Sequence, residues 1–205
     1  MTIRVHKGDL PEISRYTGPV AIDTETLGLV TQRDRLCVVQ LSPGDGTADI
    51  VQIAKGQREA PNIVALLKDA SKTKIFHYGR FDVAALYHAF GAMTDGIFCT
   101  KIASRLTRTY TDRHGLKDLA RELLGVDLSK QQQSSDWAAE TLSPAQVEYA
   151  ASDVLYLHDI MGVLYKRLER EDRMDLAKAC FGFLPTRVRL DLAGWSEEDI
   201  FSHSV

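Results

Sequence analysis

Two β-rich segments joined by a tight-turn sequence set the strongest limit on how this chain can fold. Leu36–Ser42 and Thr47–Ile53 flank the tetrapeptide Pro43-Gly44-Asp45-Gly46. Glycine and aspartate in so short a connection favour a hairpin, because they tolerate the backbone conformations of tight turns. The two segments are therefore expected to pair antiparallel, which argues against a purely parallel sheet.

Other strand-like and helix-like segments surround this hairpin. Ser143 before Pro144 is typical of a helix start, because serine caps a helix and proline suits its first position. The predicted strands are Ile3–His6, Pro19–Thr24 and Lys74–His77. The predicted helices are Pro61–Lys68, Phe81–Phe90, Thr100–Leu106, Leu116–Leu124, Pro144–Arg170 and Glu171–Phe183, the last ending at Pro185. This order predicts an α/β fold, a mixed central sheet flanked by helices, in one domain over residues 1–205.

Composition narrows the function classes. The net charge is −3, with 25 Lys and Arg against 28 Asp and Glu, which disfavours a protein that coats long nucleic acid. A short nucleic acid remains compatible with this charge. The sequence has no apolar run typical of a membrane span or signal peptide, so we expect no membrane partner. Its three widely spaced cysteines favour neither a disulfide framework nor a structural zinc site and indicate a cytoplasmic protein.

A short apolar run, Val20-Ala21-Ile22, ends abruptly in Asp23-Thr24-Glu25. Residues two apart in a strand point to the same face, so Asp23 and Glu25 are aimed at one place. Two carboxylates that close repel each other unless a proton or a cation neutralises one of them. Hard oxygen ligands suit Mg²⁺ or Mn²⁺. The pair therefore predicts half of a divalent-metal site.

Asp82 and Asp153 are the candidates for the other half. Asp82 follows the predicted strand Lys74–His77 and begins a helix, where an acid can also serve only to complement the helix dipole. Tyr149 and Asp153 are four residues apart in a predicted helix and so share one face. Taken alone, Asp153 is equally compatible with a solvent-facing position. The metal-site interpretation depends on all four acids meeting.

Together, these residues resemble the four-acid 3′→5′ exonuclease superfamily. The surrounding segments resemble ribonuclease D over nearly the whole chain, and they are Asp34–Leu41, His77–Asp82, Thr100–Leu106, Gly115–Lys117, Ser135–Trp137 and Glu148–Val154. One branch of the superfamily places a histidine five residues before the last aspartate. Glu148 occupies that position here, so the resemblance is to the tyrosine-containing branch.

The resemblance implies a ribonuclease H-like exonuclease fold and two divalent metal ions, Mg²⁺ or Mn²⁺. Asp23 would bridge both ions, Glu25 and Asp153 would complete the first site, and Asp82 would hold the second ion. Tyr149 would orient the attacking water or, if its pKa were depressed, accept its proton. Positioning is the favoured role, because a phenol with a pKa near 10 is a poor base.

The resemblance also bears on substrate and assembly. Because the sequence ends at Val205, we expect it to lack the accessory helical domains of ribonuclease D. The tracts Arg105–His114 and Lys130–Trp137 resemble the short, single-domain nanoRNase C type. That type acts on very short RNA, notably dinucleotides, and assembles as a ring-like octamer. We therefore expect short RNA as substrate, with short DNA as an open option, and a homo-oligomer.

Several residues are expected to contact the substrate. Leu29 would wedge between bases, and His77 would contact the sugar or the terminal phosphate. A core leucine and a hydrogen-bonded histidine at a strand end are the alternative interpretations. The remaining predicted contacts are Thr24, Arg108, Gln133, Ser135 and Trp137. A plain polar loop around Ser135 and a solvated arginine at 108 stay open.

Two other functions are compatible with the same fold. One is trimming of longer RNA 3′ ends, as in ribonuclease D; the expected lack of accessory domains and the negative charge disfavour it. The other is an inactive nucleic-acid-binding relative, which is expected to have lost at least one of the acids. Asp23, Glu25, Asp82, Asp153 and Tyr149 are all present in this sequence.

Overall fold

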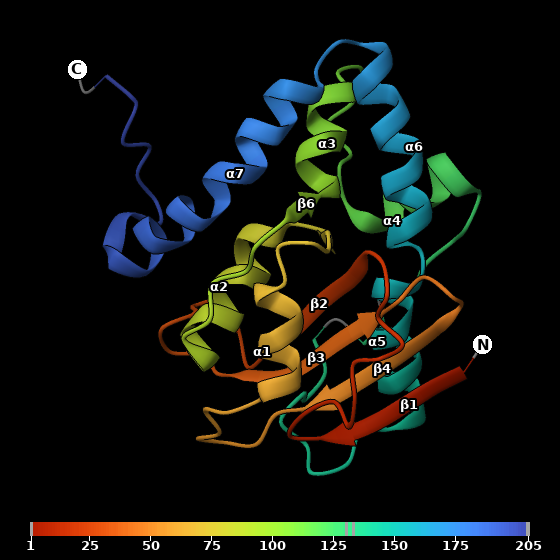
Figure 1. The fold of residues 1–205 in the computed structure, drawn as a ribbon, viewed down its shortest axis with the longest axis vertical. Helices are drawn as coiled ribbons and strands as arrows, with labels where there is room; N and C mark the ends of the chain where they lie inside the picture. Colours follow the sequence, from red (N-terminus) through yellow and green to blue (C-terminus); the bar gives the residue numbers. More distant parts are fainter. Residues whose placement is uncertain (1, 130, 133, 204–205) are drawn as a thin grey trace.

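A six-stranded mixed sheet forms the centre of the computed structural model, which describes residues 2–129, 131–132 and 134–203 (Figure 1). The spatial order is β1-β4-β3-β2-β5-β6. The strands are β1 (Thr2–Lys7), β2 (Val20–Thr26), β3 (Leu36–Ser42), β4 (Thr47–Gln52), β5 (Lys74–Phe76) and β6 (Ile97–Cys99). This architecture confirms the predicted α/β class.

The hairpin prediction is confirmed, since β3 and β4 pair antiparallel and their turn spans Pro43–Gly46. β2 also runs antiparallel to β3, whereas β1 pairs parallel with β4, and β5 pairs parallel with β2 and β6. The sheet is therefore mixed, as expected. The three-residue strand β6 was not predicted, because so short a segment has too few residues for an alternating pattern.

Helices cover both faces of the sheet. They are α1 (Pro61–Lys68), α2 (Gly79–Phe90), α3 (Thr100–Thr107), α4 (Leu116–Leu119), α5 (Pro144–Leu155), α6 (Leu157–Arg170) and α7 (Met174–Leu190). Residues 120–124 and 191–195 add π-helical turns after α4 and α7. In Figure 1, α1 and α2 lie in front of the sheet and α5 lies behind it. No helix within the described ranges is long and apolar enough to cross a membrane.

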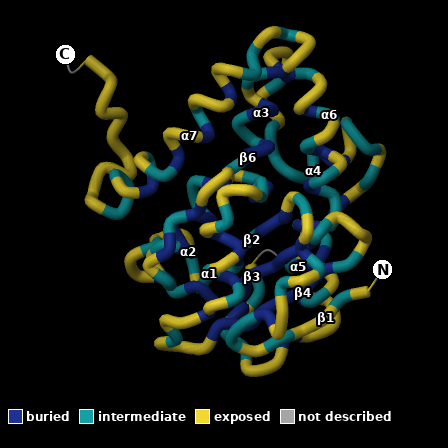
Figure 2. The backbone as a smooth tube through the Cα atoms, viewed as in Figure 1, coloured by how far each residue is buried: buried dark blue, intermediate teal, exposed yellow. Residues whose placement is uncertain are grey.

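Strand alternation divides the apolar interior into two clusters. Ala21, Val38 and Ile50 face α5, whereas Ile22 and Val39 face α1 and α2. Figure 2 shows buried backbone concentrated in the sheet, while much of α7 is exposed. β2 therefore contributes side chains to both layers, so polar residues from either layer can reach this strand.

Two helix boundaries differ from the prediction. The expected helix Pro144–Arg170 breaks at Tyr156, where φ is −102° and ψ is −3°. The apolar pattern hides this break, because Val154 and Leu157 are both fully buried. The expected stop at Pro185 is wrong, since α7 continues to Leu190. A proline inside a helix removes one backbone hydrogen bond, and burial of Leu184 and Val188 on either side supports the continued helix.

Candidate active site

Three carboxylates gather at the end of β2. Asp23 and Glu25 point to the same side of the strand, as the two-residue spacing predicts, and Asp153 reaches them from α5. One oxygen atom from each of these acids lies within 4.8 Å of the others. Ala150 and Ala151 are fully buried between α5 and the sheet, so α5 can approach β2 closely enough for Asp153 to arrive.

Asp82 approaches β2 from the opposite layer. It lies in the first turn of α2, directly after β5, and its side chain is buried. Thr24 points away from its neighbours Asp23 and Glu25 and donates its hydroxyl to Asp82 Oδ1 over 2.7 Å. We expected Thr24 to contact the substrate; the contact of its side chain in this structure fixes the fourth acid instead.

The carboxylates are too crowded to be charged together without a counter-ion. Burial raises the pKa of Asp23 to about 7. Burial, followed by the charges of Asp23, Asp153 and Asp82, raises the pKa of Glu25 to about 10. Burial and the charge of Asp23 also raise the pKa values of Asp82 and Asp153 well above the ordinary range. A divalent cation would relieve this repulsion, and an all-oxygen donor set fits Mg²⁺ or Mn²⁺.

Tyr149 lies one helical turn before Asp153 on α5, as the spacing predicts, and its hydroxyl lies beside the Asp153 carboxylate. Burial first, and then the negative charges of Asp153, Glu25 and Asp23, raise the pKa of Tyr149 above its usual value. The phenol therefore keeps its proton among the carboxylates. This favours a hydroxyl that orients other groups over one that accepts a proton.

Gln40 is a site residue that the sequence did not reveal. It lies opposite Asp23 in the β2–β3 pairing and is fully buried. Its Nε2 donates to Asp23 Oδ2 over 3.4 Å, and its Oε1 has no partner among the described residues. The available signal was a polar residue inside the apolar strand Leu36–Ser42. Only the strand register could connect it to Asp23.

Three of the expected substrate contacts remain accessible to different degrees. Leu29 is 85% exposed just after β2, so the core-leucine alternative is wrong. His77 is partly buried and its Nδ1 contacts Thr100 Oγ1 at 2.9 Å, as the hydrogen-bonded alternative predicts. Burial lowers the pKa of His77 to about 3. Ser135 is partly buried and hydrogen-bonds Gln132, whereas Gln133 lies outside the described residues.

Two expected substrate contacts need correction, because their side chains are buried. Arg108 is 1% exposed and hydrogen-bonds Glu122, Ser104 Oγ and the Arg113 carbonyl. Trp137 is 3% exposed, and its ring packs against Tyr149 with centroids 6.0 Å apart. Arg108 holds the segment after α3, and Trp137 supports the ring of Tyr149 from inside.

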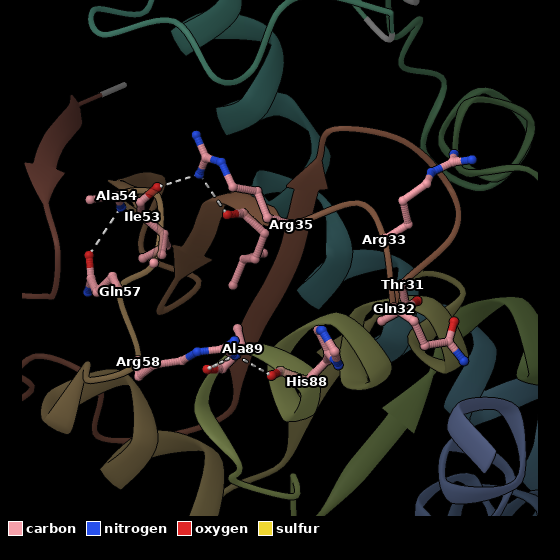
Figure 3. Close-up of a pocket in the computed structure, with 12 residues that line it drawn as sticks. Thr31, Gln32, Arg33, Arg35, Ile53, Ala54, Gln57, Arg58, His88 and Ala89 are labelled. Atoms are coloured by element: carbon pink, nitrogen blue, oxygen red, sulfur yellow. Dashed lines mark hydrogen bonds between the residues drawn. The ribbon is translucent and has the colours of Figure 1, made fainter.

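A separate cavity of about 220 Å³ lies away from the acids and is lined by several arginines (Figure 3). Arg58 donates to the carbonyls of His88 and Ala89 at the end of α2. Arg35 donates to the carbonyls of Leu36 and Ile53. Arg35 and Arg58 satisfy backbone oxygens at the ends of strands and of a helix, which gives these two arginines a structural role.

Comparison with known proteins agrees with this geometry. A 3′-5′ exonuclease family model matches residues 9–169. Ribonuclease D of Gluconacetobacter diazotrophicus is 36% identical over 156 residues, which are 76% of this chain and 39% of that protein. The chain thus spans about two fifths of the length of the curated relatives it matches.

Two solved structures from Brucella melitensis match over the whole length of both chains. NrnC with bound Mg²⁺ is 67% identical, with a TM-score of 0.96. NrnC bound to pGG is 68% identical, with a TM-score of 0.97. The family model, the identity to ribonuclease D and the shared fold agree with one another. The chain belongs to the ribonuclease D-like family of 3′→5′ exonucleases.

Proposed function

We propose that this chain is a metal-dependent 3′→5′ exoribonuclease that hydrolyses very short RNA, dinucleotides included, to nucleoside 5′-monophosphates. The observation that carries the proposal is the convergence of Asp23, Glu25 and Asp153, with Asp82 held beside them by Thr24. The Brucella NrnC structures, one with Mg²⁺ and one with pGG, support a divalent metal and a short substrate.

In this proposal each acid has a defined position. Asp23, Glu25 and Asp153 would hold one divalent cation, Mg²⁺ or Mn²⁺, and Asp23 with Asp82 would hold a second. When bound, such ions neutralise phosphate charge and activate water for in-line attack. Thr24 keeps Asp82 in place, and Gln40 restrains Asp23 from the neighbouring strand.

Tyr149 would orient the attacking water. Its hydroxyl lies beside Asp153 and its raised pKa keeps it a hydrogen-bond donor. The ring is supported by Trp137, which limits its movement. Outside the acid cluster, Leu29 would wedge against a base, because its apolar side chain projects into solvent just beyond β2. His77, Ser135 and Gln133 remain the candidates for contacts to sugar and terminal phosphate.

Trimming of longer RNA 3′ ends is the second candidate, favoured by the identity to ribonuclease D. The net charge of −3 favours the short substrate. An inactive binding protein is the least favoured, because all four acids and Tyr149 are present and the acids cluster.

Hydrolysis of 5′-labelled RNAs from two to about 20 nucleotides, with Mg²⁺ or Mn²⁺, tests the proposal. The quantity to compare is kcat/KM by length, with Asp23→Ala as the blank and DNA of equal lengths alongside. We expect the highest value for the dinucleotide. A value that is flat or rises with length would favour the trimming activity, and no metal-dependent product at any length would favour the inactive protein.

We also propose a cytoplasmic homo-oligomer, an octamer by family resemblance, whose subunits each consist of one exonuclease domain. Exposed apolar side chains outside the cavities support association, and they are Leu176, Trp195, Ile200 and Phe201. The three cysteines are free, as expected in a reducing compartment. Mass measurement in solution tests the assembly, since a monomer at micromolar concentration would contradict it.

A further inference from the structure

A cavity of about 480 Å³ lies between α3, α7 and the turn that precedes α2. Part of its wall is apolar and comes from Cys99, Ile102, Phe183 and Leu184. This volume lies within the range of about 300–1,000 Å³ that is typical of small-molecule sites. The cavity could therefore accept a flat apolar group the size of a nucleobase together with its sugar.

Four cations and no carboxylate line this cavity in the described part of the chain. Two of the cations share one carboxylate, because Arg80 and Arg187 each donate two hydrogen bonds to Asp191, so this group keeps one net positive charge. Lys101 and Arg105 lie one turn apart on α3 and pair with no carboxylate among the described residues. A local excess of positive charge thus stands in a protein whose net charge is −3.

The environment of Lys101 indicates that this excess charge is unfavourable in the free protein. Burial, followed by the positive charge of Arg105, lowers the pKa of Lys101. Two cations that repel each other at the edge of an apolar cavity would be stabilised by an anion. A phosphate monoester, which carries nearly two negative charges at neutral pH, offers the matching charge.

Tyr78 adds an aromatic surface at the same place. Its backbone is left-handed, with φ 68° and ψ 43°, a conformation that is strained for a non-glycine residue. Its side chain is 44% exposed, and the Lys101 ammonium lies 4.3 Å from the ring centroid. Tyr78 also lines the adjacent cavity that contains Leu29. A strained, exposed aromatic residue between these two cavities is suited to stacking on a base.

We propose that this cavity is a binding site for a nucleoside 5′-phosphate, with the base against Tyr78 and the apolar wall and the phosphate between Lys101 and Arg105. The inference deepens the proposed function and depends on it only for the source of the ligand. That source is either the released mononucleotide or the terminal nucleotide of an RNA substrate, since both carry a base, a ribose and a phosphate.

Calorimetric titration of the full chain in EDTA tests the proposal without turnover. Divalent cations are absent under this condition, so the acid cluster repels phosphate and binding reports on the cavity. We expect 5′-AMP to bind, and adenosine or inorganic phosphate to bind at least tenfold more weakly. The double variant Lys101→Glu/Arg105→Glu should weaken 5′-AMP binding at least tenfold. Lys166→Glu, an exposed charge reversal on α6, should leave the affinity unchanged.

Tyr78→Gly separates binding from folding. Glycine accepts the left-handed backbone without strain, so the Tm should stay equal or rise, while 5′-AMP affinity should fall at least threefold. The absence of 5′-AMP binding to the parent protein would overturn the proposal. So would a double variant that binds 5′-AMP within twofold of the parent. Neither result bears on the RNA-length assay, so the two proposals fail independently.

Steady-state hydrolysis of a dinucleotide with Mg²⁺ then identifies the source of the ligand. If the cavity receives part of the substrate, Lys101→Glu/Arg105→Glu should raise KM at least fivefold. If it receives the product, KM should stay the same and inhibition by added 5′-AMP should weaken by a similar factor. Either result supports the site, and a variant unchanged in both quantities would overturn it.

Discussion

Acids at two places in this sheet, Asp49 on β4 and the cluster around Asp23 on β2, have opposite surroundings. Asp49 on β4 is buried, and its oxygens accept hydrogen bonds from Tyr16 at 2.6 Å, His6 at 2.9 Å and Arg15 at 3.1 Å. Asp23 and its neighbours on β2 face one another and have no cation of the chain among the described residues. A buried acid that the chain itself neutralises supports the fold. A cluster of partly buried acids that the chain leaves unneutralised is suited to binding an external cation.

The largest expected effect comes from removing the shared acid. Asp23→Asn should lower kcat on a dinucleotide by about 1,000-fold or more, equivalent to ~4 kcal/mol of transition-state stabilisation. In EDTA the same variant should unfold at an equal or higher temperature, because one repelling charge is gone. Initial rates and thermal melts check both parts. A variant that loses stability in EDTA would place Asp23 in the same class as Asp49.

Asp49→Asn is the matched change in the other group. Removing the charge leaves Arg15 and its neighbours without their partner, which we expect to cost about 3 kcal/mol of unfolding free energy. The kcat of the folded protein should stay near the parent value, since Asp49 lies away from the acid cluster. Urea unfolding and initial rates measure the two quantities. A stability within 0.5 kcal/mol of the parent, on the order of surface substitutions, would contradict this role.

Tyr149→Phe tests the hydroxyl beside the acids without altering their charge. Turnover should fall by about 100-fold, or ~2.7 kcal/mol, because the attacking water loses its orienting partner. Mg²⁺ affinity by calorimetry should stay within about twofold, since phenylalanine preserves the packing on Trp137. Cleavage at the parent rate would show that the hydroxyl has no role in the reaction.

The pH dependence of stability should differ with and without Mg²⁺. The pKa of Glu25 rises from 4.5 in the unfolded chain to about 10 in the folded protein. Its contribution to the unfolding free energy is therefore complete below pH 4.5 and declines as the pH rises toward the folded pKa. Through Glu25 alone, metal-free protein should therefore lose up to about 1.4 kcal/mol of unfolding free energy per pH unit above pH 7. Saturating Mg²⁺ should flatten this slope.

Urea unfolding between about pH 7 and pH 9 measures these slopes. This window avoids His77, whose lowered pKa of about 3 has the opposite effect, a loss of stability as pH falls below 6.5. Equal slopes with and without Mg²⁺ would mean that the acids are not relieved by the ion.

The smallest expected effect is at Gln40. Gln40→Met keeps the volume but removes the donor to Asp23 Oδ2, so Mg²⁺ affinity should weaken by about fivefold, or ~1 kcal/mol. The Tm in EDTA should change little, because the unpartnered Gln40 Oε1 is removed as well. Calorimetry and thermal melts report the two quantities, with Gln40→Glu as a variant that adds charge beside Asp23. Unchanged Mg²⁺ affinity in Gln40→Met would leave Asp23 oriented by its backbone alone.

Local rules were sufficient to predict which acids share one face of a strand or helix, and to predict the hairpin. Strand alternation aligned Asp23 with Glu25, helix spacing aligned Tyr149 with Asp153, and both alignments appear in the structure. The meeting of β2 with α5 came only from the family resemblance. Periodicity states which face a residue occupies, whereas it does not state which element covers that face.

The remaining errors have the same origin. Trp137 and Arg108 lie in polar stretches that suggest exposure, yet Tyr149 covers one and Glu122 pairs with the other. Gln40 is linked to Asp23 through strand register, which no local pattern specifies. The helix break at Tyr156 leaves the apolar repeat intact, so the sequence gives no sign of it.

The approach of Asp82 and Asp153 from opposite layers has a mechanical consequence. The sheet separates two hydrophobic clusters, one under α5 and one under α2, and β2 belongs to both. Of the two proposed ions, one would join α5 to β2 and the other would join β2 to α2, so together they would cross-link the two clusters through Asp23. Occupancy of both would then make the two halves of the interior unfold as a single cooperative unit, and release of the ions would let each half fluctuate independently.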